Sequence, residues 1–446
     1  MPSNRVEHSG VEHSGVERSD PTAVPVPPGL VLAPFRALRY DPGVVPDLAA
    51  VLSPPYDVID DGQRSALEHR SAHNAVRLIL PREDEAHGRD RYAVATGLLR
   101  DWQASGVLRR DVVDALYVYE ETEPGGHVQR GLLGGVGLAE ADAGIVLPHE
   151  NTMAGPVADR LALITATATD LEPIFLVYDG GGAASAAVEA AAAGVALVDV
   201  TTDDGVRHRL FAITQAETLA AIAADLLPRV ATIADGHHRY ATYLQHQREQ
   251  HAAGRGAGPW DRGLALLVDV SRSGPAVHPI HRVVPSLPVA RAAELAGTAF
   301  RVTSLPAGDV DGAIARLAAT ASPAFIISDG AQTHLLDAPD EGQLRAALPA
   351  DRSAAFRSLD VTVAHLLLVD RLWGLRDHED VVGFEHDVPA AVAAAQRSGG
   401  TALLLAPTPV EAVAAVARAG ERMPRKSTLF TPKPRSGMVL RPHDAG

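Results

Sequence analysis

The sequence contains no cysteine, which excludes disulfide bonds, thiolate metal sites and cysteine nucleophiles. Its N-terminus also lacks the basic stretch and apolar core of an export signal, and carries acidic residues, histidine and glycine instead. The closest approach to a membrane span, residues 181–200, is mainly alanine and glycine with Glu189 inside it, so we expect a surface helix with its turns there. These absences predict a cytoplasmic protein without a membrane partner.

Aromatic residues and positive charge are scarce as well. Aromatic residues make up 4% of the chain, whereas hydrophobic residues, many of them alanine, make up 46% and charged residues 21%, which is typical of a folded globular protein. The formal net charge of -15 argues against general nucleic-acid binding, because that requires a basic surface to displace counterions from phosphates. A local basic pocket is compatible with this charge.

The 446 residues are too many for one ordinary core, so we expect two or three packed units. Residues 1–30 contain an imperfect Val-Glu-His-Ser-Gly repeat and a proline-rich stretch, and are predicted to form a disordered tail. Short apolar runs then alternate with helix-like stretches, which indicates a mixed α/β fold. We predict a core over residues 31–287, with an inserted α/β region, and a C-terminal α/β domain over residues 288–446.

Several individual elements can be predicted from the apolar pattern. Strands are expected at residues 115–119, 132–138 and 174–178, and helices at residues 91–103 and 216–227.

The strongest local signal is a strand-like run, residues 230–234, that leads through a glycine into a helix-like stretch. The junction consists of Asp235, Gly236, His237, His238 and Arg239. Backbone N–H groups at a helix N-terminus attract anions, glycine lets a ligand approach the backbone, and an arginine fork matches phosphate oxygens. The junction therefore predicts a phosphate-binding site.

Two other interpretations of this junction stay open. Asp235 could cap the helix while the histidines pack against loops and Arg239 pairs with a surface acid, with no ligand involved. Alternatively, His237 and His238 could be metal ligands, although adjacent side chains rarely point the same way.

Two further segments place polar side chains in loops. Residues 148–152 deliver His149 and Glu150 to the end of an apolar run, where such a pair could act in general acid/base catalysis, although a solvated turn before a helix would have the same pattern. Two prolines stiffen the approach to Tyr56 and Asp57, which suits an active site or an ordinary turn.

Lysine is rarer than any other charged residue. The chain has only Lys426 and Lys433 among its 40 basic residues, and both lie in one short segment near the C-terminal end. A protein that uses arginine elsewhere and keeps lysine twice here suggests a need for a compact ammonium group, of which phosphate binding is the obvious use. A chance pairing in a solvated loop is the alternative.

Two patterns carry less information. Residues 131–137 are glycine-rich but match neither the P-loop nor the dinucleotide pattern, and Lys426, Ser427 and Thr428 lack the glycines of a P-loop, so a standard P-loop NTPase is disfavoured. In residues 278–282 a strand would place the two histidines on opposite faces, so we expect one inward histidine and Arg282 as a pocket cation.

Five motifs in order resemble the bacterial family known as domain of unknown function 1015, over about residues 33–440. They lie at residues 53–59, 148–152, 234–240, 281–284 and 423–433. The Asp-Gly-His-His-Arg motif that opens a helix also resembles the nucleotide-binding motif of the ParB/sulfiredoxin-like superfamily, especially its free serine kinases. The resemblance implies a ParB/sulfiredoxin-like nucleotide-binding core. No helix-turn-helix pattern follows the motif, so the DNA-binding half of ParB is not expected.

Residue roles follow from the patterns and the resemblance together. The resemblance implies that Gly236, His237, His238 and Arg239 cradle phosphates, with Asp235 fixing the turn or a magnesium ion. The leading hypothesis is a kinase-like phosphotransferase that uses ATP or ADP with Mg²⁺ and acts on a small hydroxyl metabolite, with free serine as the example that the resemblance suggests.

The candidate catalytic residues are Glu150, Asp57, His149 and Asp235. The candidate phosphate-binding residues are Gly236, His237, His238, Arg239, Lys426, Ser427, Thr428 and Lys433. The candidate substrate-binding residues are Tyr56, Asn151, Thr152, Arg160, His281 and Arg282.

Two rival functions are considered. One is a non-catalytic nucleotide sensor or assembly factor that uses the same pocket. The other is a metal-dependent phosphohydrolase that uses His149, Glu150, His237 and His238.

Overall fold

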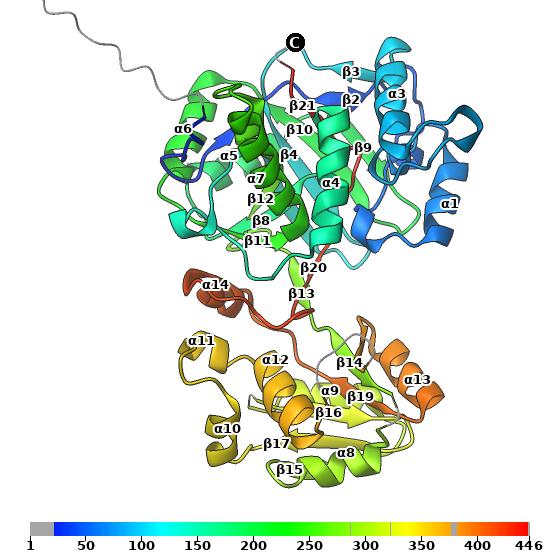
Figure 1. The fold of residues 1–446 in the computed structure, drawn as a ribbon, viewed down its shortest axis with the longest axis vertical. Helices are drawn as coiled ribbons and strands as arrows, with labels where there is room; N and C mark the ends of the chain where they lie inside the picture. The colour runs from blue at the N-terminus through cyan, green and yellow to red at the C-terminus, as the bar shows by residue number, and fades with distance from the viewer. Residues whose placement is uncertain (1–21, 286, 322, 376–380, 445–446) are drawn as a thin grey trace, which may run out of the picture.

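A large mixed sheet forms the centre of the first unit (Figure 1). The computed structural model describes residues 22–285, 287–321, 323–375 and 381–444. The sheet order is β6-β11-β8-β12-β5-β4-β10-β9, and β1 also pairs with β5. Its strands are β1 (Leu32–Ala33), β4 (Leu116–Thr122), β5 (Val128–Gly137), β6 (Val146–Leu147), β8 (Ile174–Tyr178), β9 (Val198–Thr201), β10 (Arg207–Ile213), β11 (Ala231–Asp235) and β12 (Arg262–Asp269). All of its pairings are antiparallel except β6 with β11 and β8 with β12.

The two faces of this sheet pack against different partners. Alternate residues such as Leu116 and Val118 belong to one core with α5 (Ala183–Ala192) and α6 (Ala216–Leu226). Tyr117 and Tyr119 belong to another core, which includes Phe430 from near the C-terminal end. The helices α4 (Ala154–Thr167) and α7 (His237–Ala252) lie side by side in front of the sheet in Figure 1.

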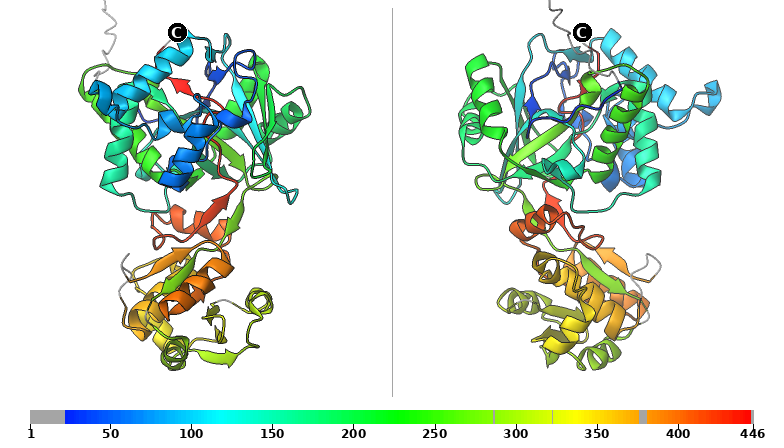
Figure 2. Two further views of the ribbon diagram at one scale, coloured as in Figure 1. Left: turned by 90° about the vertical axis from the view of Figure 1, so that its right-hand side faces the viewer. Right: turned by 60° about the vertical axis from the view of Figure 1, so that its left-hand side comes forward.

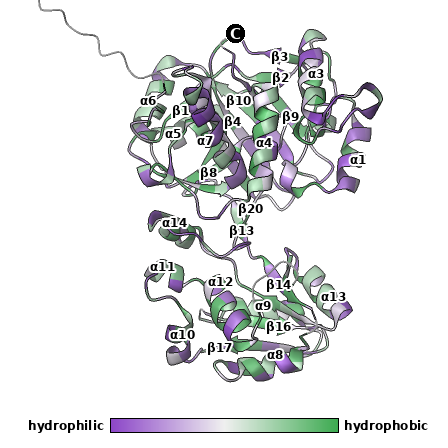
Figure 3. Cartoon of the chain, in the orientation of Figure 1, coloured by the Kyte–Doolittle hydropathy of each residue, from purple (hydrophilic) through white to green (hydrophobic). Residues whose placement is uncertain are grey.

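A smaller subregion lies beside this sheet. It contains β2 (Leu38–Tyr40), β3 (Leu108–Arg110), α1 (Asp61–Arg70), α2 (Val76–Ile79) and α3 (Arg91–Ala104). Its core includes Leu99 and Trp102 of α3. Figure 3 shows α1 largely in the hydrophilic colour, consistent with its lack of buried residues.

A six-stranded antiparallel sheet forms the second unit, with the order β15-β17-β16-β19-β14-β18. Its strands are β14 (His281–Val284), β15 (Arg301–Ser304), β16 (Phe325–Ser328), β17 (Thr333–Asp337), β18 (Gly383–Glu385) and β19 (Thr401–Leu404). Its helices are α8 (Val289–Ala296), α9 (Val310–Ala318), α10 (Glu341–Ala347), α11 (Ala354–Arg357), α12 (Asp360–Val363) with the π-helix Ala364–Leu372 that continues it, α13 (Val388–Ser398) and α14 (Val410–Arg418).

Two extended segments connect the units. The strand β13 (Ala276–His278) leads into the second unit and pairs with β20 (Leu429–Thr431), which leads back out of it. In both views of Figure 2 the red C-terminal segment continues into the first unit. There Ser436 bridges to Ser53, Leu440 bridges to Leu38, and β21 (Arg441–Pro442) pairs with β7 (Thr169–Asp170).

This return path differs from the predicted division of the chain. Residues 288–446 were expected to form one C-terminal domain, but residues 436–442 pair with strands and loops of the first unit. The predicted disordered tail falls mostly on residues 1–21, which lie outside the described residues, and Leu30 at its end is fully buried. Across the described residues, we find no helix of the length and apolarity that crossing a membrane requires.

The mixed α/β fold class predicted from the sequence is confirmed. The strand expected at residues 174–178 has those bounds as β8, and α3 and α6 differ from their expected ranges by one residue at the C-terminal end. The stretch 181–200 contains the expected helix, α5, but also the strand β9 at the edge of the sheet.

Candidate functional site

Four segments that are distant in sequence meet where the two units adjoin. The ammonium of Lys433 lies 2.5 Å from Asp235 Oδ1, at the end of β11, and 3.2 Å from Asp57 Oδ2. The charges of Lys426, Asp235 and Lys433 all shift the pKa of the Glu150 carboxyl, so these groups lie near it. The segments around these residues therefore form a single site, which we call the junction site.

The strand, turn and helix expected around Gly236 are present. The strand β11 ends at Asp235, Gly236 has a φ of 90°, and α7 begins at His237. Only glycine adopts this left-handed conformation readily, and a Cβ atom on Gly236 would also lie 3.1 Å from the guanidinium carbon of Arg239. The first N–H groups of α7 have no partner within the helix and are ready anion donors.

The guanidinium group of Arg239 does not face an open phosphate site, as the motif had suggested. It is 4% exposed, its Nη2 lies 2.6 Å from Asp235 Oδ2, and its Nη1 donates to the carbonyl of Pro173. The pKa of Arg239 is raised despite burial, because the carboxylates of Glu172, Asp235 and Asp57 surround it. Arg239 is thus turned inward, since these acceptors satisfy its charge within the protein, and it orders the turn instead of facing a ligand.

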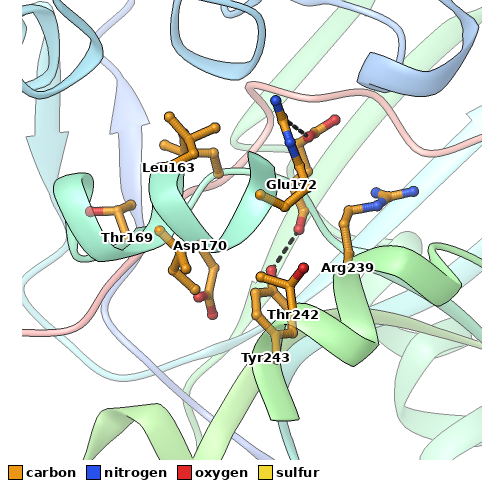
Figure 4. Close-up of a pocket in the computed structure, with 10 residues that line it drawn as sticks. Leu163, Thr169, Asp170, Glu172, Arg239, Thr242 and Tyr243 are labelled. Carbon is orange, nitrogen blue, oxygen red and sulfur yellow. Dashed lines mark hydrogen bonds and ion pairs between the residues drawn. The ribbon is translucent and has the colours of Figure 1, made fainter. Parts of the chain in front are cut away.

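A small cavity lies beside this arginine. Arg239, Thr242 and Tyr243 of α7 line it together with Leu163 and Glu172 (Figure 4). Its volume is about 30 Å³, which is room for a single water molecule. It is too small to be the substrate site.

The two histidines of the motif hold the neighbouring loop. His237 Nε2 accepts the backbone N–H of His149 at 3.2 Å, and His238 Nε2 accepts that of Met153 at 3.0 Å. Burial lowers the pKa of both histidines, and far more strongly for His237. These acceptor roles require neutral imidazoles, so the histidines position the loop of residues 149–153 and their Nε2 atoms are not available to donate to phosphate.

His149 is a buried part of the same framework. It is 1% exposed, its ring meets that of His237 edge-on at 4.6 Å, and its Nε2 lies 3.1 Å from Thr428 Oγ1. Burial lowers its pKa to about 4. His149 is therefore neutral at physiological pH and joins the loop to the lysine segment.

Glu150 is the carboxyl with the most distinctive environment. Burial, with a smaller contribution from Asp235, raises its pKa to about 7, although Lys426, Lys433 and the Ser427 amide oppose the rise. A carboxyl that titrates near neutral pH under the influence of two ammonium groups is well suited to accept or donate a proton. Asn151 and Thr152, which follow it, are exposed.

Asp57 is the second carboxylate that contacts Lys433, and Tyr56 precedes it in the chain. Burial alone would raise the pKa of Asp57, but Lys433 and Arg239 hold it below its ordinary value, so Asp57 is an anion. The amide of Tyr56 donates to Glu172 Oε1 at 3.0 Å, and the guanidinium of Arg160 lies 4.3 Å from the centre of the Tyr56 ring. Arg160 is 6% exposed, so it supports Tyr56 from behind instead of lining an open pocket.

Lys426 is presented by the second unit. It has a left-handed backbone with a φ of 54°, and its carbonyl accepts from Arg282 Nη2 at 3.0 Å. Arg282 is fully buried and its Nε donates to His365 Nε2 at 3.0 Å, while His281 Nδ1 accepts the amide of Leu405 at 3.3 Å. The inward histidine expected near residue 280 is His281, but Arg282 is a buried support for Lys426 and not a pocket cation.

The first unit positions Lys433 from both sides along the chain. Gln129 Nε2 donates to the carbonyl of Pro432 at 3.0 Å, and the hydroxyl of Tyr119 accepts the amide of Arg435 at 3.4 Å. Gln129 also donates to Glu121. The sequence did not identify these residues, because their contacts with the lysine segment join positions about 300 apart in the chain.

The described residues contain no group of three or more histidine, aspartate or glutamate side chains arranged to hold a metal ion. His237 and His238 each use Nε2 for a backbone amide. The interpretation of these histidines as metal ligands, and with it the metal-dependent phosphohydrolase, therefore has no support in this arrangement.

Comparisons with known proteins give remote structural likenesses. SbnI with a C-terminal truncation from Staphylococcus aureus has 11% identity and a TM-score of 0.34, covering 69% of this chain and 86% of its own. A free serine kinase, in a mutant form in complex with ADP, has 13% identity and a TM-score of 0.32, covering 68% and 88%. A conserved hypothetical protein from Pyrococcus furiosus has 14% identity and a TM-score of 0.30, covering 66% and 89%.

No curated protein matches the sequence. The pattern of one family does match, over residues 32–362, and its description is "Protein of unknown function (DUF1015)". The matched part contains Tyr56, Glu150 and the Asp235–Arg239 motif, whereas the two lysines lie beyond it. The chain belongs to this family of proteins of unknown function.

Proposed function

We propose that the protein is a nucleotide-dependent phosphotransferase that acts on a small hydroxyl metabolite. The observation that carries the proposal is the convergence, at the junction site, of Glu150 with Lys426 and Lys433 near the N-terminus of α7. Phosphoryl transfer is catalysed mainly by positioning and charge neutralisation, so a proton acceptor close to cations is the arrangement that it needs.

The residues present fit the phosphates of ATP or ADP. The opening N–H groups of α7 supply anion donors, and among the described residues Lys426 has no carboxylate within 4.0 Å. Lys433 is already neutralised by Asp235 and Asp57, so its role is to hold these two carboxylates in place. A bound Mg²⁺ would neutralise charge on the phosphate oxygens. Asp57 would hold it, because both oxygens of Asp235 already pair with Arg239 and Lys433.

Glu150 is the proton acceptor of the proposed reaction. The acceptor hydroxyl oxygen forms a bond to phosphorus, the bond from phosphorus to the bridging oxygen of the nucleotide breaks, and the hydroxyl proton passes to the carboxylate of Glu150. Lys426 stabilises the negative charge on the transferred group. Free serine as the acceptor rests on the motif resemblance alone and is the first candidate to test.

Phosphorus NMR tests the proposal directly. The protein is incubated with Mg²⁺, ATP or ADP, and a panel of hydroxyl metabolites that includes serine, and a new phosphomonoester signal is expected. Glu150→Gln should abolish the signal, whereas Glu140→Gln, which changes an exposed glutamate paired with Arg248, should leave it unchanged. No product with any acceptor, from protein whose fold is verified, would contradict phosphotransfer.

A second function is favoured by the position of the site between two units. A nucleotide that contacts Lys426 of the second unit and α7 of the first could change how the units adjoin without any chemistry. Such a sensor predicts thermal stabilisation by nucleotide without turnover. The same samples distinguish the two functions, because only the phosphotransferase yields a new phosphomonoester.

A further inference from the structure

An arginine-lined cavity lies next to the junction site. Its volume is about 580 Å³, which is within the range of small-molecule sites. Arg352, Arg422 and Arg425 contribute to its lining from the second unit, and Asn151 contributes from the loop that carries Glu150. Asn151 follows Glu150 and Arg425 precedes Lys426 in the chain, so two segments contribute to both the cavity and the junction site.

Arg422 and Arg352 of this cavity have little carboxylate compensation among the described residues. Arg422 Nη1 donates to the carbonyl of Glu421 at 3.3 Å, and among the described residues no carboxylate lies within 4.0 Å of its guanidinium. Arg352 lies 4.0 Å from Glu421, whose carboxylate already accepts the amide and hydroxyl of Ser353. Asp370 is the one acidic residue among those that line the cavity.

Aromatic rings fix two of these guanidinium groups in place. The guanidinium carbon of Arg352 lies 4.8 Å from the centre of the Phe356 ring, and that of Arg425 lies 4.6 Å from that of Phe384. Stacked arginines keep their planar donors oriented. Half-buried guanidinium groups are costly unless an anion compensates them, and the planar fork of arginine matches the oxygens of a carboxylate or a phosphate.

We propose that this cavity binds the anionic end, a carboxylate or a phosphate, of the metabolite whose hydroxyl reaches Glu150. The inference rests on the proposed phosphotransferase and narrows its acceptor to an anionic hydroxyl compound. Asn151 would contact the body of the acceptor between the arginines and Glu150. Neutral alcohols would then be poor acceptors, because the charge of Arg422 would stay uncompensated in the complex.

Three probes with one carbon skeleton test the cavity without requiring turnover. Binding of glycerol, glycerate and glycerol 3-phosphate is measured by isothermal titration calorimetry at low salt. Glycerol is expected to bind at least about tenfold more weakly than one or both anions, since it cannot make charge-assisted hydrogen bonds with the arginines. Binding of glycerate alone would identify a carboxylate site, and binding of glycerol 3-phosphate alone would identify a phosphate site. Binding of both would show that the cavity accepts either group.

Arg422→Gln should weaken anion binding by about tenfold or more, and Arg352→Gln provides a second test should the first variant fold poorly. Arg345→Gln is the matched control, because Arg345 lies on α10 with a side chain that is 79% exposed, and it should change nothing. Equal binding of glycerol and the anions, or anion binding that both arginine variants leave intact, would overturn the proposal. Failure of the proposed function has a different signature: anion binding that depends on Arg422 while no acceptor is ever phosphorylated.

Discussion

Replacing Glu150 by glutamine is expected to stabilise the protein at alkaline pH while it removes activity. Burial raises the pKa of Glu150 from its ordinary 4.5 to about 7. The Glu150 carboxyl therefore loses its proton at lower pH in the unfolded chain than in the folded chain. The free energy of unfolding decreases as pH rises from 4.5 to about 7, because the folded state holds this proton more tightly. A pKa difference of two to three units corresponds to on the order of 3 kcal/mol above pH 7.

Glutamine has no charge to lose, so the variant should avoid this cost. Urea unfolding at pH 4 and pH 8 measures it: Glu150→Gln should equal the wild type at pH 4 and exceed its free energy of unfolding at pH 8. Glu140→Gln, at a side chain that is 60% exposed, should show no such difference. Equal stability of Glu150→Gln and the wild type at pH 8 would refute the idea that Glu150 is held in a desolvated site.

Three further predictions concern the neighbours of Glu150. Asp235→Asn removes the carboxylate that pairs with both Arg239 and Lys433, so it should lower the free energy of unfolding by about 3–5 kcal/mol in urea titrations; a loss below about 1 kcal/mol would contradict the pairing. Gly236→Ala forces a side chain into a left-handed turn with a φ of 90° and against Arg239, so it should cost roughly 1–3 kcal/mol in thermal unfolding, and an unchanged melting temperature would argue against this turn. Lys426→Met should weaken ADP binding by about tenfold at low salt with the melting temperature of the unliganded protein unchanged, whereas equal affinity in calorimetry would remove Lys426 from the nucleotide site.

The elements of the fold were predictable where their signal is local. The strand β8 has a continuous run of buried apolar residues, and the turn at Gly236 combines a strand end, a glycine and a helix start within a few positions. Such patterns depend on the burial of neighbouring residues and need no knowledge of the rest of the chain. The rarity of lysine is a compositional signal of the same kind, and it identified a segment that does lie in the junction site.

Orientation and long-range pairing were not predictable in this way. The pattern around Arg239 is equally compatible with an outward fork, and only Pro173 and Glu172, more than sixty residues away, decide that it turns inward. The return of residues 436–442 to the first unit likewise depends on backbone pairing with Ser53 and Leu38, which leaves no periodic trace in the sequence.

The two lysines of the junction site are held by different units, and this has a consequence for how a ligand would act. Arg282 of β14 fixes the carbonyl of Lys426, whereas Gln129 of β5 fixes the carbonyl that precedes Lys433. The spacing of the two ammonium groups is therefore set by how the units adjoin, and β13 and β20 are the strands that join them. A ligand that contacts both Lys426 and the α7 N-terminus binds most tightly in one arrangement of the units, so its binding free energy also stabilises that arrangement.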